Sequence, residues 1–144
     1  SIDRYVIAKS QWVISKMDFF EGLNKKQKLT LGSDGYELYK DKALEMVTER
    51  LTVLNKQNYR FKFNKLTIKS QKTRWGSCSK KRNLNFNYKI LFLPPKIRDY
   101  IMIHELCHLK ELNHSNRFWR LVAKSIPDYS KVIGELKIKG LNIS

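Results

Sequence analysis

Residues 104–114 are His-Glu-Leu-Cys-His-Leu-Lys-Glu-Leu-Asn-His, and we expect the fold to be built around this stretch. It contains an H-E-x-x-H motif. Residues four apart on a helix lie on one face, so His104 and His108 can direct both imidazoles at one metal ion. Apolar residues surround the motif on nearly every side of the helix, which is typical of a helix at the centre of a domain. The sequence therefore predicts a central, metal-binding helix over 96–112.

A third ligand is expected after this helix, because zinc needs three protein ligands and an open fourth position. All three histidines of the chain fall within eleven residues, which favours His114. His114 is out of helical phase, so the helix must end first, and Asn113 could supply a left-handed turn. Glu111 is the alternative ligand, because it lies three residues after His108 and near the ligand face.

Glu105 directly follows the first histidine, where a carboxylate can reach a metal-bound water without being a ligand. We expect one zinc ion per chain, although affinity alone does not exclude cobalt, nickel or manganese. Zinc would lower the pKa of its water and polarise a substrate carbonyl. Glu105 would take the proton and pass it to the leaving amine. The pattern predicts amide hydrolysis without a covalent intermediate, although the same groups could attack a phosphoanhydride.

Outward from the motif, helical and two-residue periodicities alternate along the chain. Strands with one solvent-exposed face are expected at 66–70 and 84–88, and the apolar run 90–93 has the length of a strand. Helices are expected over 2–20, 36–55 with Asp34 as N-cap, 96–112 after Pro94-Pro95, and from Ser115 to about Ile126, followed by a short basic helix.

Composition bounds the class of protein. The 144 residues are one domain's worth of chain, and 42% hydrophobic with 29% charged residues excludes a disordered tail or a disulfide scaffold. No apolar run approaches the ~20 residues of a membrane span, and no signal peptide is visible, so no membrane partner is expected. Two cysteines, Cys78 and Cys107, indicate a reducing, cytoplasmic setting. The net charge of +16 would attract nucleic acid or an acidic surface, unless it serves solubility alone.

Three stretches of the sequence together resemble a known family. The first is Arg-Trp-Gly-Ser-Cys at 74–78, and the second is Asn-Tyr-Lys-Ile-Leu-Phe-Leu-Pro at 87–94. The third comprises Asp-Tyr-Ile-Met-Ile-His-Glu-Leu at 99–106, followed by His108-Leu109, His114-Ser115, Phe118-Trp119 and Pro127-Asp128-Tyr129. This combination is similar to the YgjP-like zinc metallopeptidases, relatives of the SprT-like and WLM minimal zincins. The likeness runs from about Trp12 to Tyr129.

The resemblance implies a compact α+β zincin fold over 1–144, with the active-site helix packed on a small antiparallel sheet and flanked by helices. It implies His104, His108 and His114 as ligands and Glu105 as catalytic base. Members usually carry a β-rich segment before the first helix, and Ser1 is not a methionine, so we expect the natural protein to continue before it. The metzincins share the histidine spacing, but their glycine at the position of Glu111 and their Met-turn are missing.

The roles of the first matching stretch stay open. Arg74 and Trp75 could line a substrate cleft, because a strand beside a zincin site can pair with an extended peptide. Alternatively, Trp75 packs in the core. Cys78 could be an inhibitory fourth ligand or a structural thiol, and Cys107 is given no role.

We therefore expect a zinc metallopeptidase acting on proteins or peptides. The alternatives are a metal-dependent hydrolase of nucleotides or other phosphorylated molecules, and a basic nucleic-acid-associated module with a structural zinc. The sequence has no glycine-rich phosphate loop, which counts against the nucleotide hydrolase. A structural zinc usually has four protein ligands, which counts against the module.

Overall fold

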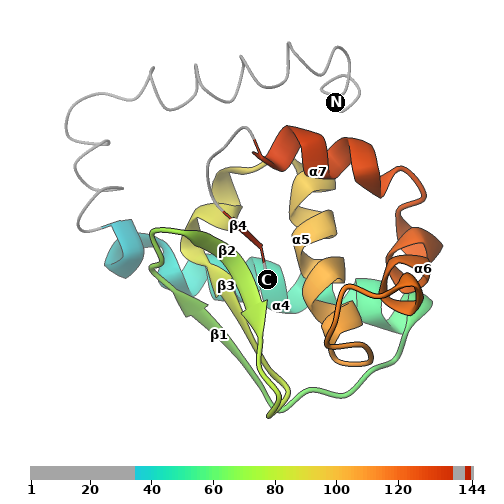
Figure 1. Cartoon of the computed structure of the whole chain (residues 1–144). Helices are drawn as coiled ribbons and strands as arrows, with labels where there is room; N and C mark the ends of the chain where they lie inside the picture. The colour runs from blue at the N-terminus through green and yellow to red at the C-terminus, as the bar shows by residue number, and fades with distance from the viewer. Residues whose placement is uncertain (1–34, 138–141, 144) are drawn as a thin grey trace.

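The computed structural model of the chain describes residues 35–137 and 142–143, which form an α+β fold as the sequence predicts. In chain order the elements are helix α4 (Gly35–Asn58), strands β1 (Lys65–Lys69), β2 (Arg74–Cys78) and β3 (Asn83–Asn87), the 3₁₀-helix η2 (Tyr88–Phe92), helices α5 (Pro95–His108), α6 (Asn116–Ser125) and α7 (Tyr129–Lys137), and strand β4 (Asn142–Ile143). Helix α5 lies between the sheet and α6, with α4 behind it and α7 near its N-terminal end (Figure 1). The predicted central position of this helix is therefore confirmed.

Helix α5 begins where the sequence predicts and ends four residues earlier than expected. Pro95 occupies its first turn, where the missing N–H costs no hydrogen bond. Ten residues from Ile97 to His108 are buried, so the helix contacts the rest of the protein on all sides. After His108 the N–H of Leu109 bonds the carbonyl of Leu106 at 3.0 Å, three residues back, which tightens and ends the helix. The predicted left-handed Asn113 is wrong, because Arg60 and Arg82 are the non-glycine residues with positive φ in the described part of the chain.

The sheet is mixed, with strand order β1-β3-β2-β4, and not wholly antiparallel as expected. Strands β2 and β3 form an antiparallel hairpin, whereas β3 inserts beside β1 and runs parallel to it. Strand β4 pairs in parallel with the outer edge of β2. Alternating polarity predicts that a segment is a strand, but it carries no information on which strand lies beside it.

The hairpin turn is tied to the C-terminal end of α5 by one arginine. Arg82 adopts φ = 68°, which closes the turn after Ser79. Its guanidinium donates from Nε to the carbonyl of Lys62 at 2.9 Å and from Nη1 to the carbonyl of Leu109 at 3.2 Å. These bonds hold the end of the sheet against the end of the active-site helix.

The apolar run 90–93 lies mostly in η2 and forms no strand. Asn87 is fully buried and caps this 3₁₀-helix, because its Oδ1 accepts from the N–H of Lys89 at 3.1 Å. Its Nδ2 donates to the carbonyls of Gln71 and Arg74 at 2.7 and 2.9 Å. Asn87 therefore ties the start of η2 to the residues around the start of β2.

Helix α4 packs its predicted apolar face inward and ends at Asn58, three residues beyond the expected end. Its buried side chains recur at helical spacing: Ala43, Val47, Leu51 and Leu54. The helix expected at 2–20 and the N-cap Asp34 lie outside the described residues. None of the described helices combines the length and apolar character that a bilayer span requires.

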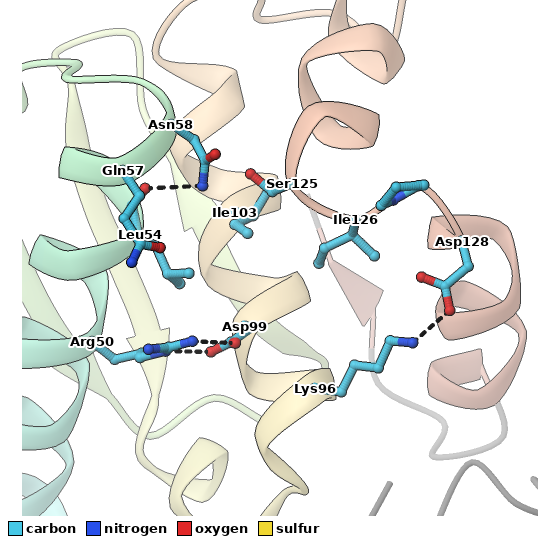
Figure 2. Close-up of a pocket in the computed structure, with 11 residues that line it drawn as sticks. Arg50, Leu54, Gln57, Asn58, Lys96, Asp99, Ile103, Ser125, Ile126 and Asp128 are labelled. Carbon is cyan, nitrogen blue, oxygen red and sulfur yellow. Dashed lines mark hydrogen bonds and ion pairs between the residues drawn. The ribbon is translucent and has the colours of Figure 1, made fainter. Parts of the chain in front are cut away.

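Two ion pairs tie the N-terminal part of α5 to its neighbours. Arg50 of α4 donates to both oxygens of Asp99, each at 2.9 Å, and Lys96 pairs with Asp128 (Figure 2). Both pairs border a hollow of about 380 Å³, which none of the histidines lines. These contacts hold α4 and the link between α6 and α7 against the helix that carries the site.

Candidate metal centre

Three histidine side chains meet at the C-terminal end of α5. His104 and His108 lie one turn apart on the helix, and His114 reaches them from the loop that follows. Nε2 of His114 lies 3.1 Å from Nε2 of His108 and 3.3 Å from Nε2 of His104. His104 and His108 are 2% and 4% exposed, whereas His114 is exposed. The cluster therefore has a buried floor and one side open to solvent.

Neighbouring groups orient the two helical imidazoles. Nδ1 of His108 lies 3.0 Å from the carbonyl oxygen of Glu111. A carbonyl only accepts, so Nδ1 carries the hydrogen and Nε2 presents a lone pair. Nδ1 of His104 lies 3.0 Å from the hydroxyl of Tyr100, one turn earlier on α5, and that hydroxyl can accept from it in the same way. Partners of this kind set the tautomer of metal-binding histidines.

Aromatic rings pack around the three imidazoles and limit their movement. The ring of Phe118 stacks on His108 at 4.5 Å and meets His104 and His114 edge-on at 4.9 and 5.0 Å. Phe118 itself is fully buried. The predicted N-cap of α6 places it there, because Ser115 Oγ accepts from the N–H of Phe118 at 3.3 Å. The cluster is therefore held by the start of α6 as well as by α5.

A second set of aromatic rings packs against His114. Trp119 stacks on His114 with ring centroids 5.7 Å apart, and Tyr129 stacks on Trp119 at 4.9 Å. The periodicity of the sequence does not predict these contacts. Their signal is the Phe118-Trp119 pair directly after the Ser115 N-cap, which puts two large rings on the first turn of a helix beside the site.

Glu105 lies between α5 and β2, where a glycine leaves space for it. Glu105 is fully buried. A Cβ atom on Gly76 would lie 3.2 Å from Cγ of Glu105 and 3.3 Å from its Oε2, and 3.2 Å from the backbone oxygen of Asn85. Contacts at these distances are tighter than most Cβ contacts in proteins, so a side chain at position 76 would require its neighbours to move by a few tenths of an ångström. Gly76 lies within β2, and its missing side chain makes room for the carboxylate.

The geometry and chemistry of this cluster fit zinc. Two nitrogen ligands at about 2.05 Å from a tetrahedral zinc are about 3.3 Å apart, close to both observed separations. Nitrogen lone pairs this close to each other repel unless a cation or a proton lies between them. Three imidazoles are also the ligand set of known catalytic zinc sites that keep a fourth position open. The residues present could therefore hold one zinc ion and leave a position for a reactant.

The other candidate ligands and substrate-binding residues from the sequence lie in different environments. Glu111 contributes its backbone carbonyl to His108, and His114 is the third member of the cluster. Arg74 is exposed on β2, whereas Trp75 is 3% exposed and packs in the core. Cys78 is half-buried on β2 and is not part of the histidine cluster.

Both thiols are expected to react slowly at neutral pH. Burial, with a smaller contribution from Glu105, raises the pKa of Cys78 to about 11, and burial raises that of Cys107 to about 12. The thiolate is the reactive form, so a raised pKa lowers the reaction rate at pH 7.5 and the rate should climb as pH rises. We expect Ellman's reagent to modify the native protein at least ~100-fold more slowly than the urea-unfolded protein. Protection of Cys78 that depends on zinc would contradict its exclusion from the metal site.

Comparisons with known proteins identify the class of protein to which the chain is similar. A sequence model of the YgjP-like metallopeptidase domain matches residues 20–139. The metallopeptidase zymogen of Pyrococcus abyssi abylysin resembles the structure with a TM-score of 0.54 and 27% identity, covering 72% of this chain and 98% of that chain. The zymogen of Methanocaldococcus jannaschii jannalysin does so with a TM-score of 0.51 and 26% identity, covering 67% and 95%. No curated protein sequence matches the chain. Because the family match spans most of its length, the chain belongs to the YgjP-like metallopeptidase family.

Proposed function

We propose that the protein is a zinc-dependent peptidase that hydrolyses amide bonds in protein or peptide substrates. The observation that carries this proposal is the convergence of three histidine Nε2 atoms, one of which belongs to the residue directly before the buried Glu105. Family membership and the two neighbouring metallopeptidase structures support the same class of enzyme.

In this proposal His104, His108 and His114 hold the zinc ion through Nε2. The bound ion would lower the pKa of a water ligand and polarise the scissile carbonyl. The hydrogen bonds at the far nitrogens of His104 and His108 keep the two rings oriented. Phe118 limits the movement of all three rings. The exposed side of His114 is where a substrate would approach.

Glu105 is the proposed general base and then the general acid. Its carboxylate would accept a proton from the attacking water and deliver it to the nitrogen of the departing amine. Its burial removes competing solvent, which makes its electrostatic interactions stronger. Gly76 positions this group by leaving it space on the β2 side.

Strand β2 is the proposed wall along which an extended peptide would bind. It contacts α5 and carries the exposed Arg74 at its start. Its outer edge is paired with the two residues of β4 in the structure. A substrate that adds a strand at this edge would therefore have to replace β4.

A comparison of substrate classes tests the proposal. Protein purified without added metal should cleave unfolded casein, lose activity with a chelator and regain it with one equivalent of zinc. Nucleotides and phosphorylated small molecules should not be turned over in a parallel assay. Zinc-dependent turnover of a nucleotide with no cleavage of any protein would contradict the peptidase assignment in favour of a phosphoanhydride hydrolase.

The variant Gly76→Ala tests whether Gly76 positions the side chain of Glu105. The added methyl group lies within 3.3 Å of both a side chain and a backbone oxygen, so Glu105 must shift by a few tenths of an ångström. We expect kcat to fall by roughly 10- to 100-fold while zinc stays bound, because catalysis is sensitive to small displacements of the reacting groups. Gly134→Ala on α7 is the matched control, because its Cβ would meet nothing within 4 Å. Equal activity of the two variants would show that Gly76 does not position the carboxylate.

A further inference from the structure

We propose that a cationic patch at the C-terminal end of α5 binds nucleic acid through its phosphate backbone. The patch comprises six exposed side chains: Lys62, Lys81, Lys110, Arg117, Arg120 and Lys124. None of them belongs to the metal centre, so this activity is separate from the proposed peptidase.

Positive and negative charges are segregated along the chain. Residues 50–98 contain 14 lysines and arginines and no aspartate or glutamate. In contrast, Glu37, Asp41, Glu45 and Glu49 recur every four residues on α4 and therefore lie along one face of that helix. The net charge of +16 is thus distributed unevenly, and the sheet side of the molecule carries a large share of it.

Specific contacts hold the backbone of three patch residues, Lys62, Lys81 and Lys110, near the C-terminal end of α5. The guanidinium of Arg82 donates to the carbonyls of both Lys62 and Leu109, so it links these two segments. Asn64 donates to the carbonyl of Lys81, so the backbone of this hairpin residue is also held at the same end. Leu109 is followed directly by Lys110. The three lysines of this part therefore come from three segments that Arg82 and Asn64 hold side by side.

Helix α6 completes the patch. Lys110, Arg117 and Arg120 line a hollow of about 300 Å³ together with Leu121. Nζ of Lys124 lies 5.8 Å from the centre of the Tyr59 ring, and the Tyr59 hydroxyl donates to the carbonyl of Leu121 at 2.6 Å. Tyr59 lies near Lys62 in the sequence, so this bond joins α6 to the segment that leads into β1.

The six charges are available to a ligand. Within residues 35–137 and 142–143 the ion pairs are Lys40–Glu37, Arg50–Asp99 and Lys96–Asp128, none of which involves the patch. Glu111 is the one acidic residue that lines the α6 hollow. A polyanion that approaches this end of the protein would therefore meet six cations and little opposing charge.

A nucleic acid fits these features better than a membrane surface. Duplex DNA carries one charge per roughly 1.7 Å of axis when both strands are counted, so it can meet several separated cations at once. Guanidinium groups such as Arg117 and Arg120 match phosphate oxygens with paired donors. Stable membrane binding needs buried apolar groups as well as charge, and the six patch residues supply charge alone.

The test measures binding of the full chain to a labelled 20-base-pair DNA and to its single strand by fluorescence anisotropy between 50 and 300 mM salt. If all six cations contact phosphates, log K against log salt should have a slope of about −5 for the duplex. The variant K110Q/R117Q/R120Q should reduce that slope by about 3 and weaken binding at least ~10-fold at 100 mM salt. The control K42Q/K69Q/K131Q removes the same charge from exposed positions elsewhere and should bind within about threefold of wild type.

Several results would overturn the proposal. An equal loss of DNA affinity in both triple variants would show an effect of net charge alone. Binding that ignores salt, or no binding, would exclude phosphate contacts. Tighter, patch-dependent binding to phosphatidylserine vesicles than to DNA would assign the patch to membranes. If the first variant unfolds, K62Q/K81Q/K124Q must show the loss instead. DNA binding should persist in the presence of a chelator, so this test is independent of the metal centre.

Discussion

Glu105→Gln is expected to lower kcat for peptide hydrolysis by about 10²- to 10⁴-fold while zinc stays bound. Glutamine has nearly the same shape, so the contacts with Gly76 and the packing of α5 on β2 should persist. Its amide cannot accept a proton from water at neutral pH. The loss should therefore appear in kcat, with little change in metal content or in the thermal unfolding midpoint.

Glu111→Gln is the matched control for this variant. Glu111 is half-buried, and it assists His108 through its backbone carbonyl, which the substitution leaves in place. We expect activity and zinc content close to wild type. Undiminished activity of Glu105→Gln would contradict the proposed general base, and loss of zinc in Glu111→Gln would favour Glu111 as a ligand.

Phe118→Ala is expected to lower the free energy of unfolding of the zinc-free protein by about 3–5 kcal/mol. Phe118 is fully buried and its ring contacts all three imidazoles. Its removal leaves a cavity beside the cluster as well as a loss of apolar burial. A loss of this size is a large part of the 5–15 kcal/mol that is typical of a whole domain.

Urea unfolding in the presence of chelator measures this change without a contribution from bound metal. Leu112→Ala is the control, because Leu112 lies in the loop between α5 and α6 and is 52% exposed. Its expected effect is within about 0.5 kcal/mol. A loss below about 1 kcal/mol for Phe118→Ala would show that the ring does not anchor α6 to the site. Wild-type zinc affinity in this variant would show that the histidines keep their arrangement without it.

The sequence predicts the parts of the structure that depend on local spacing. The apolar residues of α4 and α5 and the Ser115 N-cap follow from helical period and capping chemistry. The approach of His114 to the other two histidines follows from the placement of all three within eleven residues. The α+β class and the family follow from the combination of three motifs with that pattern.

The features that the sequence analysis misses depend on contacts between distant segments. The parallel pairing of β1 with β3 and the early end of α5 are set by tertiary packing. The space that Gly76 gives Glu105 depends on how closely β2 approaches α5, which no local pattern reports. The contact between Tyr100 and His104 could have been predicted from the sequence, because their four-residue spacing puts both on one face of the helix.

The most direct test of the central claim is the zinc content per chain, by elemental analysis, of wild type and His114→Ala purified in parallel without added metal or chelator. We expect about one zinc per wild-type chain and much less in the variant, because two imidazoles alone leave the site short of a ligand. Absence of metal from wild type, or equal occupancy in the two proteins, would contradict a metal centre built from His104, His108 and His114.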